Sequence, residues 1–387
     1  MKRPFRIGFL TPYSGIYPFY PQHLTAGWLL GMGLDPFRQD RVQFVHEYTK
    51  TGSGRDSVQA VRKLVFFDRV DLVSGLVGYK AITEAIPVLE QAGQTAFFFD
   101  MGEYIPYFPY LSPNIFYASH QLWQSEYALG HWAQQYFGDA GLVLMPVYEA
   151  GYHFSAAFRR GAIAAGNTAL HLQVLPDDPG QSMQIRLKNF FASLEEKEPP
   201  YVHAIFCGNH GTAFLAEWAK SKWAKRIPLL VNEPMAYDDI LQDVANLDLE
   251  IYSSTMWDNQ GQHGLNREFV DSFEAACGQK ANVFALMGYE AGLVWKELWP
   301  SVEKADWDGI RNLLRQEIIV GPRGERNFYP QSGFALPQTT IYKIRTSRQQ
   351  PQKMALAQGK GMHFNAAAFE EIHRDSVSGW QNPFMCV

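Results

Sequence analysis

Aromatic and acidic side chains stand in the loops that follow the predicted strands of this chain. These residues are Tyr13, Tyr17, Phe19, Tyr20, Tyr79, Tyr148, Tyr152, Trp257, Asp100, Glu103, Glu149 and Glu233. A ring face and a carboxylate both attract an ammonium group that has lost its water. If these loops lie close together in the fold, their side chains predict a binding site for an amine-bearing or aromatic ligand. The alternative is that the rings cover a helix or line an interface.

The stretch from Phe5 to Gly33 shows how one of these loops arises. An apolar strand over residues 7–10 runs into a turn that contains Ser14, and an apolar-periodic helix begins near Gln22. In an open parallel sheet, such a loop lies at the carboxyl edge of the sheet, where ligands usually bind. The rings of this loop therefore indicate that it forms one wall of a ligand pocket.

Sequence motifs for catalysis are absent. The chain has no G-x-S-x-G or H-E-x-x-H motif, no clustered Cys and His, and no dinucleotide fingerprint. The Gly-rich residues 51–57 lack the spacing of a phosphate loop and predict an ordinary turn. Glu371 and His373 have no metal-binding partners at useful spacing, and Glu149 and Glu233 have no accompanying nucleophile for acid–base chemistry. We therefore expect no enzyme, no cofactor and no metal.

Composition narrows the class of protein. A chain of 387 residues favours two domains, and a formal net charge of -5 gives no electrostatic reason to bind nucleic acid. Cys207, Cys277 and Cys386 leave one disulfide possible, but form no framework. No apolar run is long enough to insert into a membrane. Because no leader precedes the first strand, we expect a cytoplasmic chain, or an exported one whose leader has been replaced by a start Met.

Strands alternate with helices along the chain. The first series predicts strands over residues 7–10, 42–48, 70–78 and 95–102, and helices over 57–67, capped by Asp56 or Ser57, and 80–93. An extended segment at 115–119 and a helix over 121–137 lead into a second series with strands over 141–148, 169–176, 202–208, 227–233 and 249–257. Helices over 266–277 and 285–302 indicate a return to the first lobe. The pattern predicts an α/β protein with doubly wound parallel sheets; residues beyond about 345 stay unassigned.

Five segments in order resemble the type I periplasmic binding proteins, in the branch that binds leucine, isoleucine and valine or amides. They are IGFLTPYSG (7–15), VDLVSGLVGYKAITEAIPVLEQAG (70–93), LSPNIFYASH (111–120), VFALMGYEAGLVWKEL (283–298) and GPRGERNFYPQSGFALPQTTIYKI (321–344). The resemblance implies two doubly wound parallel-sheet lobes joined by a three-segment hinge. Lobe 1 would take residues 1–118 and about 256–330. Lobe 2 would take residues 119–255 and about 331–387, including a C-terminal extension.

The resemblance also implies which side chains line the cleft between the lobes. In lobe 2, Tyr152 and His210 match the family's ligand-contacting rings, and Glu233 matches the acid that binds a ligand's ammonium. In lobe 1, the loops read Gly78-Tyr79-Lys80 and Asp100-Met101-Gly102-Glu103, where amino-acid binders carry small hydroxyl residues. Two acids would repel a ligand carboxylate, which disfavours a standard aliphatic amino acid unless Lys80 points into the cleft.

The function implied is that of an extracytoplasmic solute-binding protein that captures a small amino-acid-like, amine or aromatic ligand between its lobes and delivers it to the permease of an ABC transporter. The alternative is a cytoplasmic sensor of the amide-binding type that acts through a protein partner. The candidate ligand-binding residues are Tyr13, Ser14, Tyr17, Phe19, Gly78, Tyr79, Asp100, Met101, Glu103, Tyr148, Tyr152, His210, Glu233 and Trp257.

Overall fold

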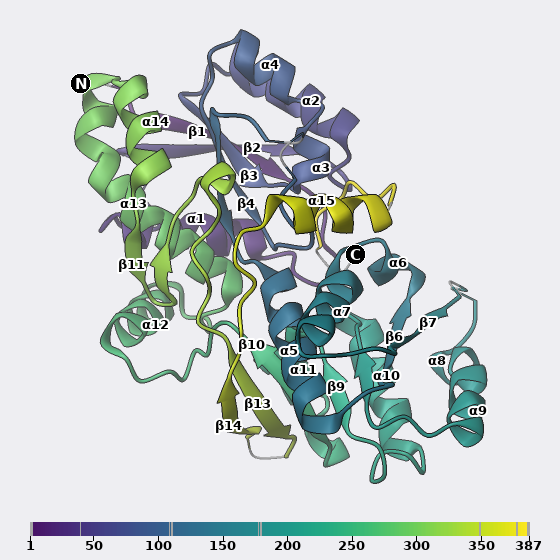
Figure 1. Ribbon diagram of the computed structural model, residues 1–387. Coiled ribbons are helices and arrows are strands. Elements are labelled where there is room, and N and C mark those ends of the chain that lie inside the picture. The colour runs from purple at the N-terminus through teal and green to yellow at the C-terminus, as the bar shows by residue number, and fades with distance from the viewer. Residues whose placement is uncertain are drawn as a thin grey trace.

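The computed structural model of the protein describes residues 3–384, apart from residues 39, 108, 110, 177, 179, 348, 349 and 377. It has two lobes, each built on one sheet flanked by helices (Figure 1). The chain passes between the two sheets three times: after Ser119, after Thr255 and between Arg326 and Thr340. The predicted two-lobed α/β class is confirmed.

The first lobe holds a five-stranded parallel sheet in the order β2-β1-β3-β4-β5. Its strands are β1 (Phe5–Thr11), β2 (Val42–Tyr48), β3 (Leu72–Leu76), β4 (Ala96–Asp100) and β5 (Ile115–Ser119). The three strands β3, β4 and β5 are buried along their whole length. This burial is typical of parallel sheets, because helices cover both of their faces.

Helices from two separate stretches of the chain, residues 20–91 and 264–316, cover this first sheet. They are α1 (Tyr20–Gly31), α2 (Gly54–Arg62) with its π-helical extension η1 (Lys63–Phe67), α3 (Tyr79–Ile82), α4 (Ile86–Gln91), α12 (Gly264–Cys277), α13 (Val283–Lys304) and α14 (Trp307–Gln316). Helices α1 and α13 touch backbone to backbone, since a Cβ at Gly288 would lie 2.1 Å from the carbonyl oxygen of Leu24. Only glycine permits this approach.

The second lobe holds a seven-stranded sheet in the order β14-β13-β10-β9-β8-β6-β7. Its strands are β6 (Leu142–Pro146), β7 (His171–Leu175), β8 (Val202–Ala204), β9 (Leu229–Val231), β10 (Glu250–Thr255), β13 (Thr340–Arg345) and β14 (Gln352–Gln358). The strands β6 to β10 pair in parallel, whereas β13 and β14 add antiparallel pairs at one edge. This sheet therefore has the predicted parallel arrangement in β6 to β10 and is mixed only at the edge that β13 and β14 form.

The helices of the second lobe lie mostly between its strands in the sequence. They are α5 (Leu122–Phe137), α6 (Val147–Ala150), α7 (Phe154–Ala164), α8 (Met183–Arg186), α9 (Lys188–Glu196), α10 (Gly208–Lys220), η3 (Glu233–Ala236), α11 (Asp238–Asp243) and η4 (Ala245–Leu247). A short hairpin, β11 (Ile319–Gly321) and β12 (Gly324–Arg326), and the 3-10 turn η5 (Pro330–Ser332) lead back into β13. No helix among the described residues is long and apolar enough to cross a membrane.

Two local predictions need correction, and the structure adds elements where the sequence predicted none. Helix α2 is capped by Ser53, whose hydroxyl accepts from the N–H of Asp56, so the predicted caps one turn later are wrong. The single helix predicted over 80–93 is two helices, because Pro87 cannot donate a hydrogen bond and is accepted only in the first turn of α4. The end of the chain that the sequence left unassigned contains β14 and a further helix, α15 (Ala366–Asp375), which lies at the junction of the two lobes (Figure 1).

Candidate ligand site between the lobes

Two carboxyl groups are buried where β4 ends. Asp100 and Glu103 are 0% and 1% exposed. One oxygen of Asp100 accepts a hydrogen bond from the N–H of Gly102 at 2.5 Å. Neither oxygen of Glu103 makes a hydrogen bond of normal geometry with the described residues. The Oε1 atom of Glu103 lies only 2.6 Å from the position a Cβ would take at Gly78, so that glycine makes room for the carboxyl.

Tyrosines from both lobes surround these acids. The rings of Tyr79 and Tyr117 lie 4.5 Å apart in the first lobe, and Tyr104 lies 5.6 Å from Tyr152 of the second lobe. Tyr148 completes the set, because its hydroxyl accepts a hydrogen bond from Tyr152 at 2.9 Å. We call this group the acid–tyrosine cluster; its members are Asp100, Glu103, Tyr79, Tyr104, Tyr117, Tyr148 and Tyr152.

Glu103 stands at the electrostatic centre of the cluster. Burial raises the pKa of all five tyrosines, and the nearby charge of Glu103 adds to that rise in each of them. The lobes are in contact at this point, since the carbonyl oxygen of Glu103 accepts from the N–H of His153 at 2.9 Å. The cluster is thus closed from both sides.

Burial also changes the titration of the two acids. It raises the pKa of Asp100 to about 7, and it raises the pKa of Glu103 to about 8 with a further contribution from the charge of Asp100. The two carboxyl groups titrate as a pair. Near neutral pH the pair retains at least part of its protons, and a desolvated cation placed between them would favour the ionised form.

This pair makes stability depend on pH. Between the ordinary pKa of a carboxyl group and the raised values, the folded chain binds protons that the unfolded chain has released. Stability should therefore fall as the pH rises from about 4 to about 8, by up to about 1.4 kcal/mol per pH unit for each retained proton. Thermal unfolding at several pH values measures this slope. The double variant D100N/E103Q should flatten it, whereas E297Q, at an exposed position of α13, should not; an unchanged slope in the double variant contradicts the assignment.

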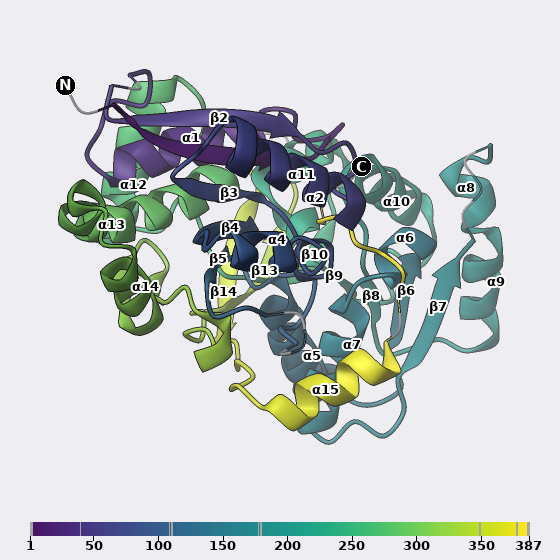
Figure 2. The same ribbon diagram turned by 90° about the horizontal axis from the view of Figure 1, so that it is seen from above.

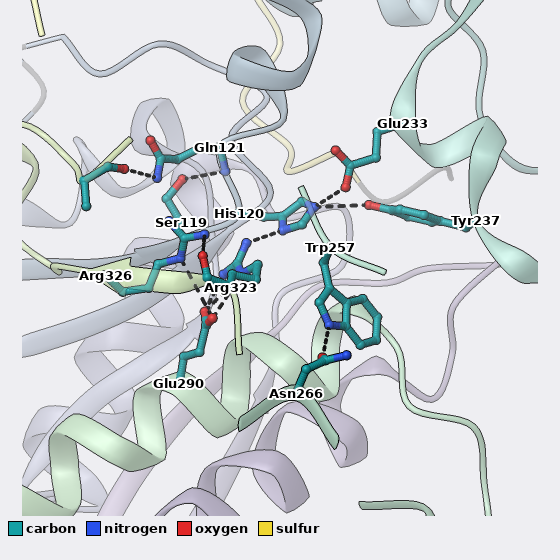
Figure 3. A network of polar contacts seen from close by, with 11 residues as sticks. Ser119, His120, Gln121, Glu233, Tyr237, Trp257, Asn266, Glu290, Arg323 and Arg326 are labelled. Atoms are coloured by element: carbon teal, nitrogen blue, oxygen red, sulfur yellow. Dashed lines mark hydrogen bonds and ion pairs between the residues drawn. The ribbon is translucent and has the colours of Figure 1, made fainter. Parts of the chain in front are cut away.

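A second group of the predicted rings lines a cavity of about 730 Å³. Tyr17 and Phe19 reach it from the loop between β1 and α1, and Trp257 from the crossing after β10. The indole N–H of Trp257 donates to the side chain of Asn266 at 2.7 Å (Figure 3). Asp239 also lines the cavity. The candidate rings therefore divide between this cavity and the acid–tyrosine cluster.

Several other candidate residues have different surroundings. The Tyr13 ring is 51% exposed and His210 is exposed on α10, whereas Met101 is buried in the core. The hydroxyl of Ser14 accepts from the N–H of Tyr17 at 2.9 Å. Lys80 lies over the ring of Tyr104, 4.2 Å from its centroid. Their roles as ligand contacts stay predictions.

Glu233 belongs to a buried polar network that joins the lobes (Figure 3). Its Oε1 atom lies 2.8 Å from Nε2 of His120, and its Oε2 atom accepts from the N–H of Met256 at 3.3 Å. The Nδ1 atom of His120 lies 2.6 Å from the guanidinium of Arg323. Because both of its oxygens are engaged, Glu233 is less available to a ligand ammonium than Glu103.

The same network continues into the first lobe through an ion pair. Arg323 donates two hydrogen bonds to Oε2 of Glu290, at 2.5 and 3.2 Å, and Arg326 lies 3.8 Å from Glu290. All three side chains are almost fully buried. Burial opposes ionisation of Glu290, yet the two guanidinium groups hold its pKa below the ordinary value. Glu290, Arg323 and His120 form the hinge network, together with Glu233.

Sequence reasoning missed most of this network. The residue that could have predicted this network is Glu290, an acid within the apolar helix sequence VFALMGYEAGLVW. A carboxylate at such a position needs a buried cation, and the hairpin GPRGER offers two arginines three residues apart. His120 gave no such signal.

Comparison with known proteins agrees with the geometry. The topology of two α/β lobes joined by three chain crossings is that of a type I periplasmic binding protein. Residues 4–350 match the family described as "Periplasmic binding protein", and the chain belongs to this family. No curated protein sequence matches it.

Solved structures resemble the chain over nearly its whole length. An ABC transporter substrate-binding protein from Sphaerobacter thermophilus is 21% identical with a TM-score of 0.79, covering 93% of this chain and 99% of that one. A solute-binding protein from Rhodopseudomonas palustris BisB5, in complex with 3,4-dihydroxybenzoic acid, is 18% identical (TM-score 0.73; 93% and 98% covered). An amino acid ABC transporter substrate-binding protein from Pseudomonas fluorescens Pf-5 is 13% identical (TM-score 0.75; 95% and 98% covered). At these identities the likeness concerns the fold.

Proposed function

We propose that this protein is an extracytoplasmic solute-binding protein that captures a small amine-bearing ligand between its lobes for the permease of an ABC transporter. The observation that carries the proposal is the pair Asp100 and Glu103, buried among five tyrosines from both lobes. Ring faces and carboxylates together attract a desolvated ammonium. Closure of the two lobes adds Tyr148 and Tyr152 of the second lobe to the acids and tyrosines of the first.

An amine suits this cluster better than a carboxylate does. The unsatisfied oxygens of Glu103 carry negative charge once the group is ionised, and an ammonium, whether primary or quaternary, offers the positive charge that balances it. A ligand carboxylate would meet two acids, and would bind only while they keep their protons. Aromatic acids, such as the one bound by the Rhodopseudomonas protein, are therefore the natural competing class.

The cysteines support a location outside the cytoplasm. Cys207 is disulfide-bonded and Cys277 is free. Structural disulfides persist in oxidising compartments and are rare in the cytosol. The pairing of Cys207 with Cys277 that the sequence left open does not occur.

A thermal-shift screen tests the proposed function. The chain is heated with amines and quaternary amines, aromatic acids, aliphatic amino acids and amides. A ligand at about 100 times its dissociation constant should stabilise the folded state by roughly 2.7 kcal/mol. We expect the stabilising compounds to be amines, and we expect the same compounds to lose their effect in E103Q. Stabilisation by aliphatic amino acids or benzoates alone would contradict the proposed ligand class.

A further inference from the structure

Residues 378–384, near the end of the chain, contact both lobes. After α15 the chain runs between helices of both lobes, as the yellow trace in Figures 1 and 2 shows. We call residues 378–384 the C-terminal segment. Toward the first lobe, Lys80 donates to the carbonyl oxygen of Ser378 at 3.1 Å, and the N–H of Gly54 donates to the side chain of Gln381 at 2.9 Å. The segment therefore has specific partners in the first lobe.

Its contacts with the second lobe are equally specific. The indole N–H of Trp380 donates to the carbonyl oxygen of Tyr148 at 2.8 Å. The side-chain amide of Asn382 donates to the hydroxyls of Tyr148 and Tyr152, at 2.7 and 3.0 Å. Phe384 is 2% exposed, with its ring 5.4 Å from that of Tyr152. The segment thus bridges both lobes and covers the acid–tyrosine cluster.

The segment contacts side chains to which we assign the ligand, but it provides no cation to balance the charge of the buried acids. Tyr148 and Tyr152 bind its amide. The backbone N–H of Phe384 opposes part of the rise in the pKa of Glu103, although neither oxygen of Glu103 has a hydrogen bond of normal geometry with the described residues. The described residues of the segment carry no charged side chain. It therefore fills the space without supplying the cation that the acids favour.

We propose that the C-terminal segment is an intramolecular occupant of the ligand cleft, so that its docking and the binding of ligand exclude each other. This inference rests on the proposed function, because it assigns the ligand to the same cluster. A segment that docks in this way lowers the apparent affinity by the fraction of molecules in which the cleft is filled. A cationic ligand that pairs with Glu103 gains an interaction that the segment lacks, and can push residues 378–384 aside. Because Cys207 is disulfide-bonded and Cys277 is free, we expect this movement to be local, without release of the segment from the protein.

Gly151 offers a test from outside the segment. The indole of Trp380 lies so close that a Cβ at Gly151 would be 1.5 Å from its Cδ1 atom. Gly151 has a φ of -73°, which alanine adopts without strain. The full-length variant G151A should therefore expel Trp380, and W380A should loosen the segment from within. G379A is the matched control, because a Cβ there meets nothing within 4 Å.

Calorimetric titration with phenyltrimethylammonium, a permanent cation with a ring, gives the readout. G151A and W380A should each raise its affinity by about tenfold, and the double variant should gain no more than either one. G379A should match the wild type. An affinity that falls in G151A and W380A would mean that the segment is a wall of the site, and an unchanged affinity would mean that it does not compete; either result overturns the inference.

Hydrogen exchange separates this inference from the proposed function. If phenyltrimethylammonium binds none of the chains, the proposed amine site fails, and exchange at residues 378–384 still reports whether the segment is docked. Faster exchange in G151A than in the wild type and G379A supports docking in the cleft. Equal exchange in all three chains overturns it. In a wild type that binds the amine, saturation should speed exchange of the segment, and slower exchange would contradict displacement.

Discussion

Replacing Glu290 by alanine should lower the free energy of unfolding by about 3–5 kcal/mol, because it leaves buried guanidinium groups without their carboxylate. Arg323 and Arg326 are 2% and 4% exposed at their side chains, and Glu290 is the carboxylate to which both are paired. Water cannot reach them to replace the lost hydrogen bonds. Urea titration followed by circular dichroism measures the change.

A second acid on the same helix provides the control. Glu297 is exposed on α13, so E297A should change stability by no more than about 0.5 kcal/mol. The variant E290Q keeps the volume of the side chain but removes its charge, so it distinguishes the two contributions. We expect its free energy of unfolding to be lowered nearly as much as that of E290A. A loss below about 1 kcal/mol in E290A would mean that the hinge network contributes little to holding the fold.

Replacing Glu103 by glutamine should weaken the binding of an amine by about 2–5 kcal/mol, which is roughly thirtyfold to several thousandfold in the dissociation constant. The carboxylate is buried, and the tyrosines around it exclude water, so its interaction with a cation is only weakly screened. Without ligand, the same variant should be more stable than the wild type above about pH 8, because the folded chain no longer has to bury the charge.

These opposite effects on binding and stability distinguish a site from a structural acid. D100N should act in the same direction as E103Q, and E297Q should leave both quantities unchanged. If E103Q binds the amine as the wild type does, the ligand lies elsewhere, and the cavity that contains Tyr17, Phe19 and Asp239 becomes the place to test. A loss of stability in E103Q at every pH would contradict the raised pKa of Glu103.

The sequence predicted the fold because its signals are local and repeated. Apolar strands such as residues 72–76 and 96–100 alternate with amphipathic helices, and that alternation alone leads to parallel sheets. The errors were local as well. Ser53 lies within a Gly-rich turn that offered several capping residues, and Pro87 was read as part of a helix interior rather than as the start of a new helix.

The candidate site was less predictable, because it depends on how two lobes meet. Residues at the carboxyl edge of one sheet, such as Asp100 and Tyr79, can be grouped from topology. Which loop of the second lobe faces them is decided by the hinge, and no local pattern states that Tyr152 joins Glu103 while Trp257 lines a separate cavity. The C-terminal segment was unreadable for the same reason: it has no periodicity, and its partners lie more than 200 residues away in the sequence.

The pH dependence of binding tests the central claim most directly. Phenyltrimethylammonium and benzoate keep their charges between pH 6 and pH 9, so any change in affinity over that range reports groups of the protein. If the ligand cation pairs with ionised Asp100 and Glu103, the affinity of the wild type for phenyltrimethylammonium should rise with pH, by up to about tenfold per pH unit for each proton released, and level off above about pH 8. An affinity that is constant or falls with pH, or benzoate binding in place of amine binding, would contradict the account.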